Sequence, residues 1–134
     1  MTESIVHDTD TAAGIIRLGN AFCDAQALLT AARLDLFTVL AEHGPADVER
    51  VRELLGLHGR GLRDFLQLLT ALGLLDNVDG RYRNGPEAAR YLVGEQPPSV
   101  AGFLRGLGSN LYSMWAGLTD TLRTGVPRST GERF

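Results

Sequence analysis

The hydrophobic pattern is clearest in the middle of the chain. Between Leu62 and Leu72, apolar residues recur at intervals of three and four, which is the period of one face of an α-helix, and Gly73 follows as a typical helix end. Two short candidate strands, 74–76 and 81–83, flank the dipeptide Asp79-Gly80, a strong signal for a β-hairpin turn. The pattern therefore predicts a helix followed directly by a small two-stranded hairpin.

Helical periodicity also appears on both sides of this unit. Helices are expected from Thr11 to about Leu29, over about 34–43 and 47–55, from Pro86 to about residue 93, over about 100–107, and over about 111–124. The order helix, helix, helix, small hairpin, helix is that of a winged helix-turn-helix. We predict an all-α fold with a small β-wing.

The organisation of the chain follows from these elements and from its length of 134 residues, which suits one domain with a short extension. The predicted segments are a flexible N-terminus at 1–10, a winged-helix-like domain at 11–95, a helical extension at 96–127, and a linker or cut end at 128–134. The stretch Gly106-Leu107-Gly108-Ser109 lacks the preceding strand and third glycine of a dinucleotide loop, so a turn between two helices is expected there.

Candidate catalytic chemistry is sparse. The three histidines (His7, His43 and His58) are isolated from one another and from the single cysteine, so no metal-ligand spacing occurs. Cys23 has no obvious base partner, and its apolar helical setting favours a packed thiol. We therefore predict no catalytic, metal-binding or cofactor-binding residue, and no apolar run approaches the roughly 20 residues of a membrane span.

DNA binding is the alternative that a winged helix always raises. Arg60 and Arg63 begin the segment that would enter a major groove, but Asp64 would face the phosphates with them. The formal net charge is −3, whereas DNA-binding modules usually present a distinctly basic surface. The charge balance argues against a DNA partner.

Two groups of apolar residues are candidates for contacts with other molecules. The first predicted helix has few charges and small residues on several sides, so part of it is expected to meet a second chain. The predicted dimer-interface residues are Ile15, Ile16, Phe22 and Leu29. The predicted ligand-lining residues are Tyr112, Met114 and Trp115, because aromatic and thioether side chains suit a flat apolar molecule.

The succession of motifs resembles the N-terminal dimerisation domain of bacterial S-adenosylmethionine-dependent O-methyltransferases of natural-product biosynthesis. The resemblance covers about residues 14–127 and rests on an ordered series of segments: Leu34-Asp35-Leu36-Phe37 through Pro45, Arg60-Gly61-Leu62 through Leu75, Asp79-Gly80-Arg81-Tyr82, Pro86 through Leu92, Trp115 to Leu118, and Leu122 through Pro127. The chain departs from the family at His58-Gly59 and at Asn84-Gly85, where Asp-Pro and Thr-Pro are frequent.

This resemblance implies a homodimer that covers the acceptor substrate, a small aromatic or polyketide-like molecule. It also implies that S-adenosylmethionine binds to a following catalytic domain and not to these residues. The expectation is a piece of a longer, cytoplasmic methyltransferase. The alternatives are a stand-alone winged-helix protein that binds a small molecule as a partner subunit, or a DNA-binding transcriptional regulator.

Overall fold

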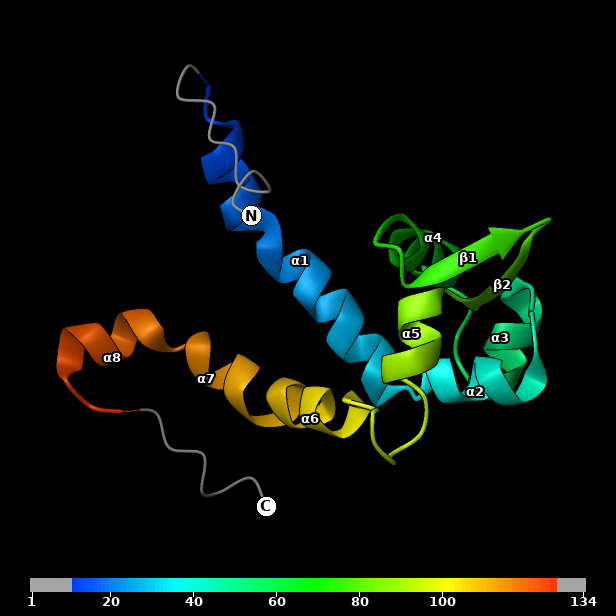
Figure 1. Ribbon diagram of the computed structural model, residues 1–134. Coiled ribbons are helices and arrows are strands. Elements are labelled where there is room, and N and C mark those ends of the chain that lie inside the picture. Colours follow the sequence, from blue (N-terminus) through cyan, green and yellow to red (C-terminus); the bar gives the residue numbers. More distant parts are fainter. Residues whose placement is uncertain (1–10, 128–134) are drawn as a thin grey trace.

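The computed structural model describes residues 11–127, which form a helical chain with one small β-hairpin (Figure 1). The elements are α1 (Ala13–Arg33), α2 (Leu36–His43), α3 (Val48–Leu55), α4 (Leu62–Ala71), β1 (Leu75–Val78), β2 (Arg81–Asn84), α5 (Pro86–Tyr91), α6 (Ala101–Gly106), the π-helix η1 (Leu107–Leu111), α7 (Tyr112–Trp115) and α8 (Leu118–Thr124). The predicted all-α fold with a small β-wing is confirmed.

The hairpin that forms the wing is antiparallel, with Leu75 opposite Asn84 and Val78 opposite Arg81. Asp79 and Gly80 both have positive φ angles (54° and 81°), as a type I′ turn requires. The backbone of Ala46, between α2 and α3, forms an isolated antiparallel bridge with the backbone of Tyr82. This bridge joins the wing to the connection between α2 and α3.

Local capping explains where the middle helices begin and end. The Asp47 carboxylate accepts a hydrogen bond from the backbone N–H of Arg50 at 2.8 Å, which satisfies one of the free donors at the start of α3. Gly56 ends α3 in the left-handed conformation, with φ 64°. Leu34 closes α1 instead of beginning α2, so the second helix starts two residues later than its periodicity predicts.

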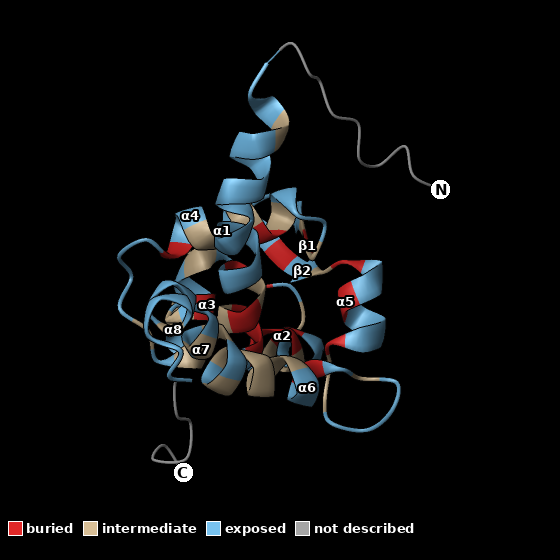
Figure 2. Ribbon diagram, turned by 90° about the vertical axis from the view of Figure 1, so that its left-hand side faces the viewer, coloured by how far each residue is buried: buried red, intermediate tan, exposed pale blue. Residues whose placement is uncertain are grey.

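The core lies between α2, α3, α4, the wing and the second half of α1 (Figure 2). Its largest fully buried side chains are those of Tyr82, Phe37, Leu36, Leu66, Leu69, Leu75 and Val51. The Asn84 side-chain amide donates to the backbone oxygen of Phe37 at 2.9 Å and so ties the end of β2 to α2. We call α2 to α5 with this core the winged-helix body.

Residues 101–127 form the C-terminal helices, which we call the arm, and its first two elements, α6 and η1, pack against α1. The predicted turn at Gly106-Leu107-Gly108-Ser109 is wrong, because Gly106 is the last residue of α6 and the next three residues continue the helix in η1. The predicted last helix is interrupted between α7 and α8, near Gly117, and ends at Gly125 as expected. The helix thus runs from α6 through a π-helical segment that packs against α1.

The predicted segment boundaries are not tested by the structure. The boundary between 95 and 96 falls in the connection from α5 to α6, and the N-terminal and C-terminal segments at 1–10 and 128–134 lie outside the described residues. Within residues 11–127, no helix combines the length and the apolar character needed to cross a membrane.

Candidate functional site

The first half of α1 extends away from the winged-helix body (Figure 1), and every residue from 15 to 26 is exposed. Ile15, Ile16 and Phe22, three of the predicted interface residues, are 78%, 59% and 60% exposed. Leu18, which sequence reasoning did not single out, is 79% exposed on the same half of the helix. Soluble monomers rarely leave so many large apolar side chains together in water, so this half-helix is a candidate contact surface.

Leu29, the fourth predicted interface residue, lies in a different environment. It is only 7% exposed, and a Cβ atom placed on Gly108 of η1 would lie 3.5 Å from the Cβ of Leu29. The arm of the same chain therefore covers Leu29. An interface role for these four residues stays a prediction, and in the single chain only the first three are accessible.

Cys23 is also exposed, on the same half of α1, so the expectation of a thiol packed within the chain was wrong. The sequence alone did not distinguish the exposed position of Cys23 from the covered position of Leu29. Helical periodicity identifies apolar positions, but it does not indicate which of them the chain's own arm covers.

The arm carries a second set of exposed apolar side chains. Trp115 is 70% exposed, Leu122 76%, and Val126 65%. None of the residues in η1, α7 and α8 is buried. The arm and the first half of α1 thus each expose apolar side chains, and residues 15–26 and the elements η1, α7 and α8 contain no buried residue.

Two shallow apolar hollows lie along the arm, and Trp115 forms part of both. One, of about 280 Å³, is lined by Leu111, Met114, Trp115, Leu118, Thr121 and Pro127. The other, of about 330 Å³, lies between the arm and α1 and is lined by residues that include Leu28, Leu104, Leu107, Tyr112 and Trp115. The three predicted ligand-lining residues therefore do line hollows, although Met114 and Tyr112 lie in different ones.

Tyr112 has a further role that its sequence position did not reveal. Its hydroxyl donates a hydrogen bond to the backbone oxygen of Phe22 at 3.1 Å. This bond ties the start of α7 to the middle of α1. The signal in the sequence was that Tyr112 lies off the apolar stripe of the last helix, which left it free to reach a neighbouring element.

The face that would read DNA carries charges of both signs. In the wing, the Nε atom of Arg83 lies 3.6 Å from a carboxylate oxygen of Asp76, so part of the basic charge is paired. Among residues 11–127, no three His, Cys, Asp or Glu side chains gather closely enough to hold a metal ion. The large side chains exposed on the first half of α1 and on the arm include Ile15, Phe22, Trp115 and Leu122, which offer apolar contact.

A winged-helix body that carries an exposed apolar helix and an apolar arm defines a module for helical association. A family model for the O-methyltransferase dimerisation domain matches residues 16–94, more than half of the chain. The chain belongs to this family of O-methyltransferase dimerisation domains.

Two curated relatives from Streptomyces illustrate the match. The tetracenomycin polyketide synthesis 8-O-methyl transferase TcmO of Streptomyces glaucescens is 45% identical over 121 residues, covering 87% of this chain and 35% of that protein. The 3-hydroxy-5-methyl-1-naphthoate 3-O-methyltransferase of Streptomyces sahachiroi is 35% identical over 119 residues, covering 89% and 32%. The chain thus spans about a third of the length of the curated relatives it matches.

Solved structures agree with this assignment. Human N-acetylserotonin methyltransferase in complex with SAM superposes with a TM-score of 0.79 at 29% identity, over 96% of this chain and 38% of that one. PigF with SAH gives a TM-score of 0.76 at 27% identity, over 87% and 38%. The likeness includes the arm as well as the winged-helix body, because the matched share of this chain exceeds the residues of the family model.

Proposed function

We propose that the chain forms the homodimeric, substrate-covering module of an S-adenosylmethionine-dependent O-methyltransferase. The single observation that carries the proposal is the exposure of large apolar side chains on both the first half of α1 and the arm, including Ile15, Leu18, Trp115 and Leu122. Complete burial of one such side chain stabilises an assembly by about 1.5–3 kcal/mol. Two copies related by a two-fold axis can cover both surfaces at once.

The acceptor substrate is proposed to contact the arm. Trp115 and Met114 line one hollow, and Trp115 and Tyr112 line the other, so a flat molecule would meet an aromatic or thioether face in either. The hollows are open on one side, and the rest of the pocket would come from the catalytic domain or from the second copy. The names of the relatives, a polyketide-pathway enzyme and a naphthoate methyltransferase, favour an aromatic or polyketide-like acceptor.

The methyl donor is proposed to bind to another part of the parent enzyme. Gly106 and Gly108, the one glycine-rich candidate for a phosphate cradle, lie within helical backbone, where the amide groups are engaged along the helix axis. Two similar solved structures hold SAM or SAH, which supports S-adenosylmethionine as the cofactor of the parent protein. Action in the cytoplasm also stays a prediction.

Sedimentation equilibrium of the 134-residue chain, combined with the emission of its single tryptophan, tests the proposal. Twice the chain mass of 14.5 kDa is expected, with Trp115 emission shifting to longer wavelength as the protein is diluted and the indole becomes solvated. The matched control is Val78→Ala in the wing, which is expected to leave both readings unchanged. A monomer at every concentration would contradict the dimer.

Substrate covering needs a second measurement on the same dimer. A small aromatic acceptor such as a hydroxynaphthoate is expected to quench Trp115 emission in the wild type and to bind more weakly to Met114→Ala. Equal binding by the wild type and this variant would contradict a contact between the acceptor and the arm. The wing control, Val78→Ala, is expected to bind the acceptor as the wild type does.

A further inference from the structure

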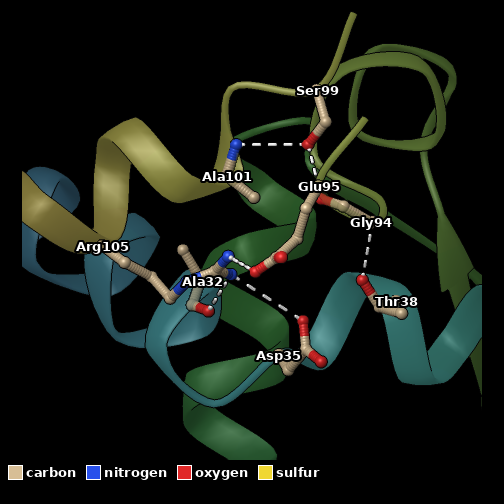
Figure 3. A network of polar contacts seen from close by, with 8 residues as sticks. All are labelled: Ala32, Asp35, Thr38, Gly94, Glu95, Ser99, Ala101 and Arg105. Atoms are coloured by element: carbon tan, nitrogen blue, oxygen red, sulfur yellow. Dashed lines mark hydrogen bonds and ion pairs between the residues drawn. The ribbon is translucent and has the colours of Figure 1, made fainter. Parts of the chain in front are cut away.

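Arg105, in α6 at the base of the arm, contacts three separate segments of the chain (Figure 3). Its Nη2 atom donates to a carboxylate oxygen of Glu95, in the connection before α6, at 2.8 Å. Its Nη1 atom donates to the backbone oxygen of Ala32 at 3.5 Å and lies 3.9 Å from a carboxylate oxygen of Asp35. One guanidinium therefore joins α6 to the end of α1 and to the α5–α6 connection.

The contact with Ala32 places a positive charge where α1 ends. The Ala32 backbone oxygen already accepts the Asp35 N–H at 3.1 Å, and the end of a helix carries partial negative charge, so an additional guanidinium there is favourable. Asp35 lies between α1 and α2 in the left-handed conformation, with φ 61°. This conformation turns the chain from α1 into α2, and the Asp35 carboxylate lies near the Arg105 guanidinium. The Arg105 side chain is 28% exposed, less than those of its acidic partners.

The connection before α6 is itself fixed to the winged-helix body (Figure 3). The backbone N–H of Gly94 donates to the Thr38 hydroxyl at 2.9 Å, and the Ser99 hydroxyl donates to the Gly94 backbone oxygen at 2.8 Å. The Ser99 oxygen also accepts from the backbone N–H of Ala101, the first residue of α6, at 3.2 Å. Glu95 thus offers Arg105 a partner that is anchored next to α2.

Beyond Arg105 the arm packs against α1 chiefly through η1. Its remaining elements, η1, α7 and α8, contain no buried residue. The close approach of Gly108 to Leu29 and the hydrogen bond from Tyr112 to Phe22 guide it along α1. The direction in which the arm leaves the body therefore depends strongly on its base.

We propose that Arg105 is a positioning residue, which through the arm sets the location of the Trp115 side chain. The inference rests on the proposed function, in which that side chain meets the acceptor. Ten residues of helix separate the two positions, or about 15 Å at 1.5 Å per residue. A change of 10° at the base would move Trp115 by about 3 Å, and misplacement by about 1 Å can cost on the order of a hundredfold in rate.

Distances between two spin labels, measured by pulsed electron paramagnetic resonance, test this directly. The labels are placed on Gln67→Cys in α4 and Thr119→Cys in α8, both exposed positions, in a Cys23→Ser background. Labelled chain is mixed with excess unlabelled chain, so that only distances within one chain are observed. The parent protein should give a single narrow distribution, and Arg105→Gln should broaden or shift it by about 3–4 Å, because Thr119 lies four residues beyond Trp115 on the same lever.

A variant of the partner residue Glu95 and a control variant at another arginine make the result specific to the contacts of Arg105. Glu95→Gln should also broaden the distribution, and the double variant should be no broader than Arg105→Gln alone, because the contact that Glu95→Gln removes is already lost in Arg105→Gln. Arg63→Gln, which removes an exposed arginine of α4, should leave the distribution unchanged. A charge effect without positioning would act equally in both arginine variants.

The outcomes separate this inference from the proposed function. An unchanged distribution in Arg105→Gln, or additive broadening in the double variant, would overturn the inference. If Arg105→Gln does not fold by circular dichroism, Glu95→Gln alone decides, and an unchanged distribution in that variant overturns it. A monomeric protein whose arm broadens in Arg105→Gln would contradict the homodimer and leave the positioning role intact.

Discussion

Truncation of Phe22 gives the sharpest test of the surface on α1. The side chain is 60% exposed in the single chain, while its backbone oxygen accepts the hydrogen bond from Tyr112. Phe22→Ala removes the ring and leaves that backbone contact in place. The variant therefore tests the exposed surface without detaching the arm.

The expected size of the effect follows from the exposed fraction. Full burial of a phenylalanine side chain contributes about 1.5–3 kcal/mol, so covering the exposed 60% contributes about 1.4 kcal/mol per copy. A two-fold dimer contains the residue twice, which gives about 3 kcal/mol. Because each 1.4 kcal/mol is tenfold in an equilibrium constant, the Kd of the dimer should rise about a hundredfold.

Sedimentation equilibrium over a dilution series measures that Kd, and thermal unfolding at a concentration where both proteins are monomeric checks that the fold is intact. Val78→Ala, at a residue 45% exposed in the wing, is the matched control and should leave the Kd unchanged. A Kd for Phe22→Ala equal to that of the wild type would refute the assignment of this face to the interface.

Three further predictions concern the body, the arm and the surface charges. Leu66→Ala, at a fully buried position of α4, should lower the free energy of unfolding by about 3 kcal/mol in denaturant titrations. Gly108→Ala should raise the free energy of unfolding by about 0.5 kcal/mol, since the added methyl group meets Leu29 at an ordinary contact distance. Gly108→Leu should instead displace the arm and so speed hydrogen exchange in η1. The hydrogen bond from Arg52 lowers the pKa of Glu49, so the stabilisation by this pair is present above the ordinary carboxyl pKa and is lost as the pH falls through the lowered value. Glu49→Gln should therefore lower the Tm slightly at neutral pH and leave it unchanged in strong acid; an equal difference at both pH values would contradict this.

The winged-helix body could be predicted from the sequence because its signals are local. The apolar residues of α4 repeat with the helical period over the whole helix, and Asp79-Gly80 specifies the turn between the strands. Ala46 carries no such signal. Its bridge to Tyr82 depends on the wing folding back over the connection between α2 and α3, and periodicity contains no information about that contact.

The candidate site was predicted only in part, because its geometry depends on contacts between distant residues. Tyr112, Met114 and Trp115 were identified by residue type, and the structure places each of them along a hollow. The position of Leu29 beneath η1 depends on how the arm packs along α1. Arg105 has no motif, and its partner Ala32 lies 73 positions away in the chain.

The buried core and the exposed apolar surface lie on different parts of the molecule, with the core in the body and the second half of α1. A substitution on the outer half of α1 or on the arm can therefore alter which chains recognise one another while the body still folds. Related modules in one cell could in this way diverge into pairs that do not mix. Selection for partner choice and selection for folding would act on separate sets of residues.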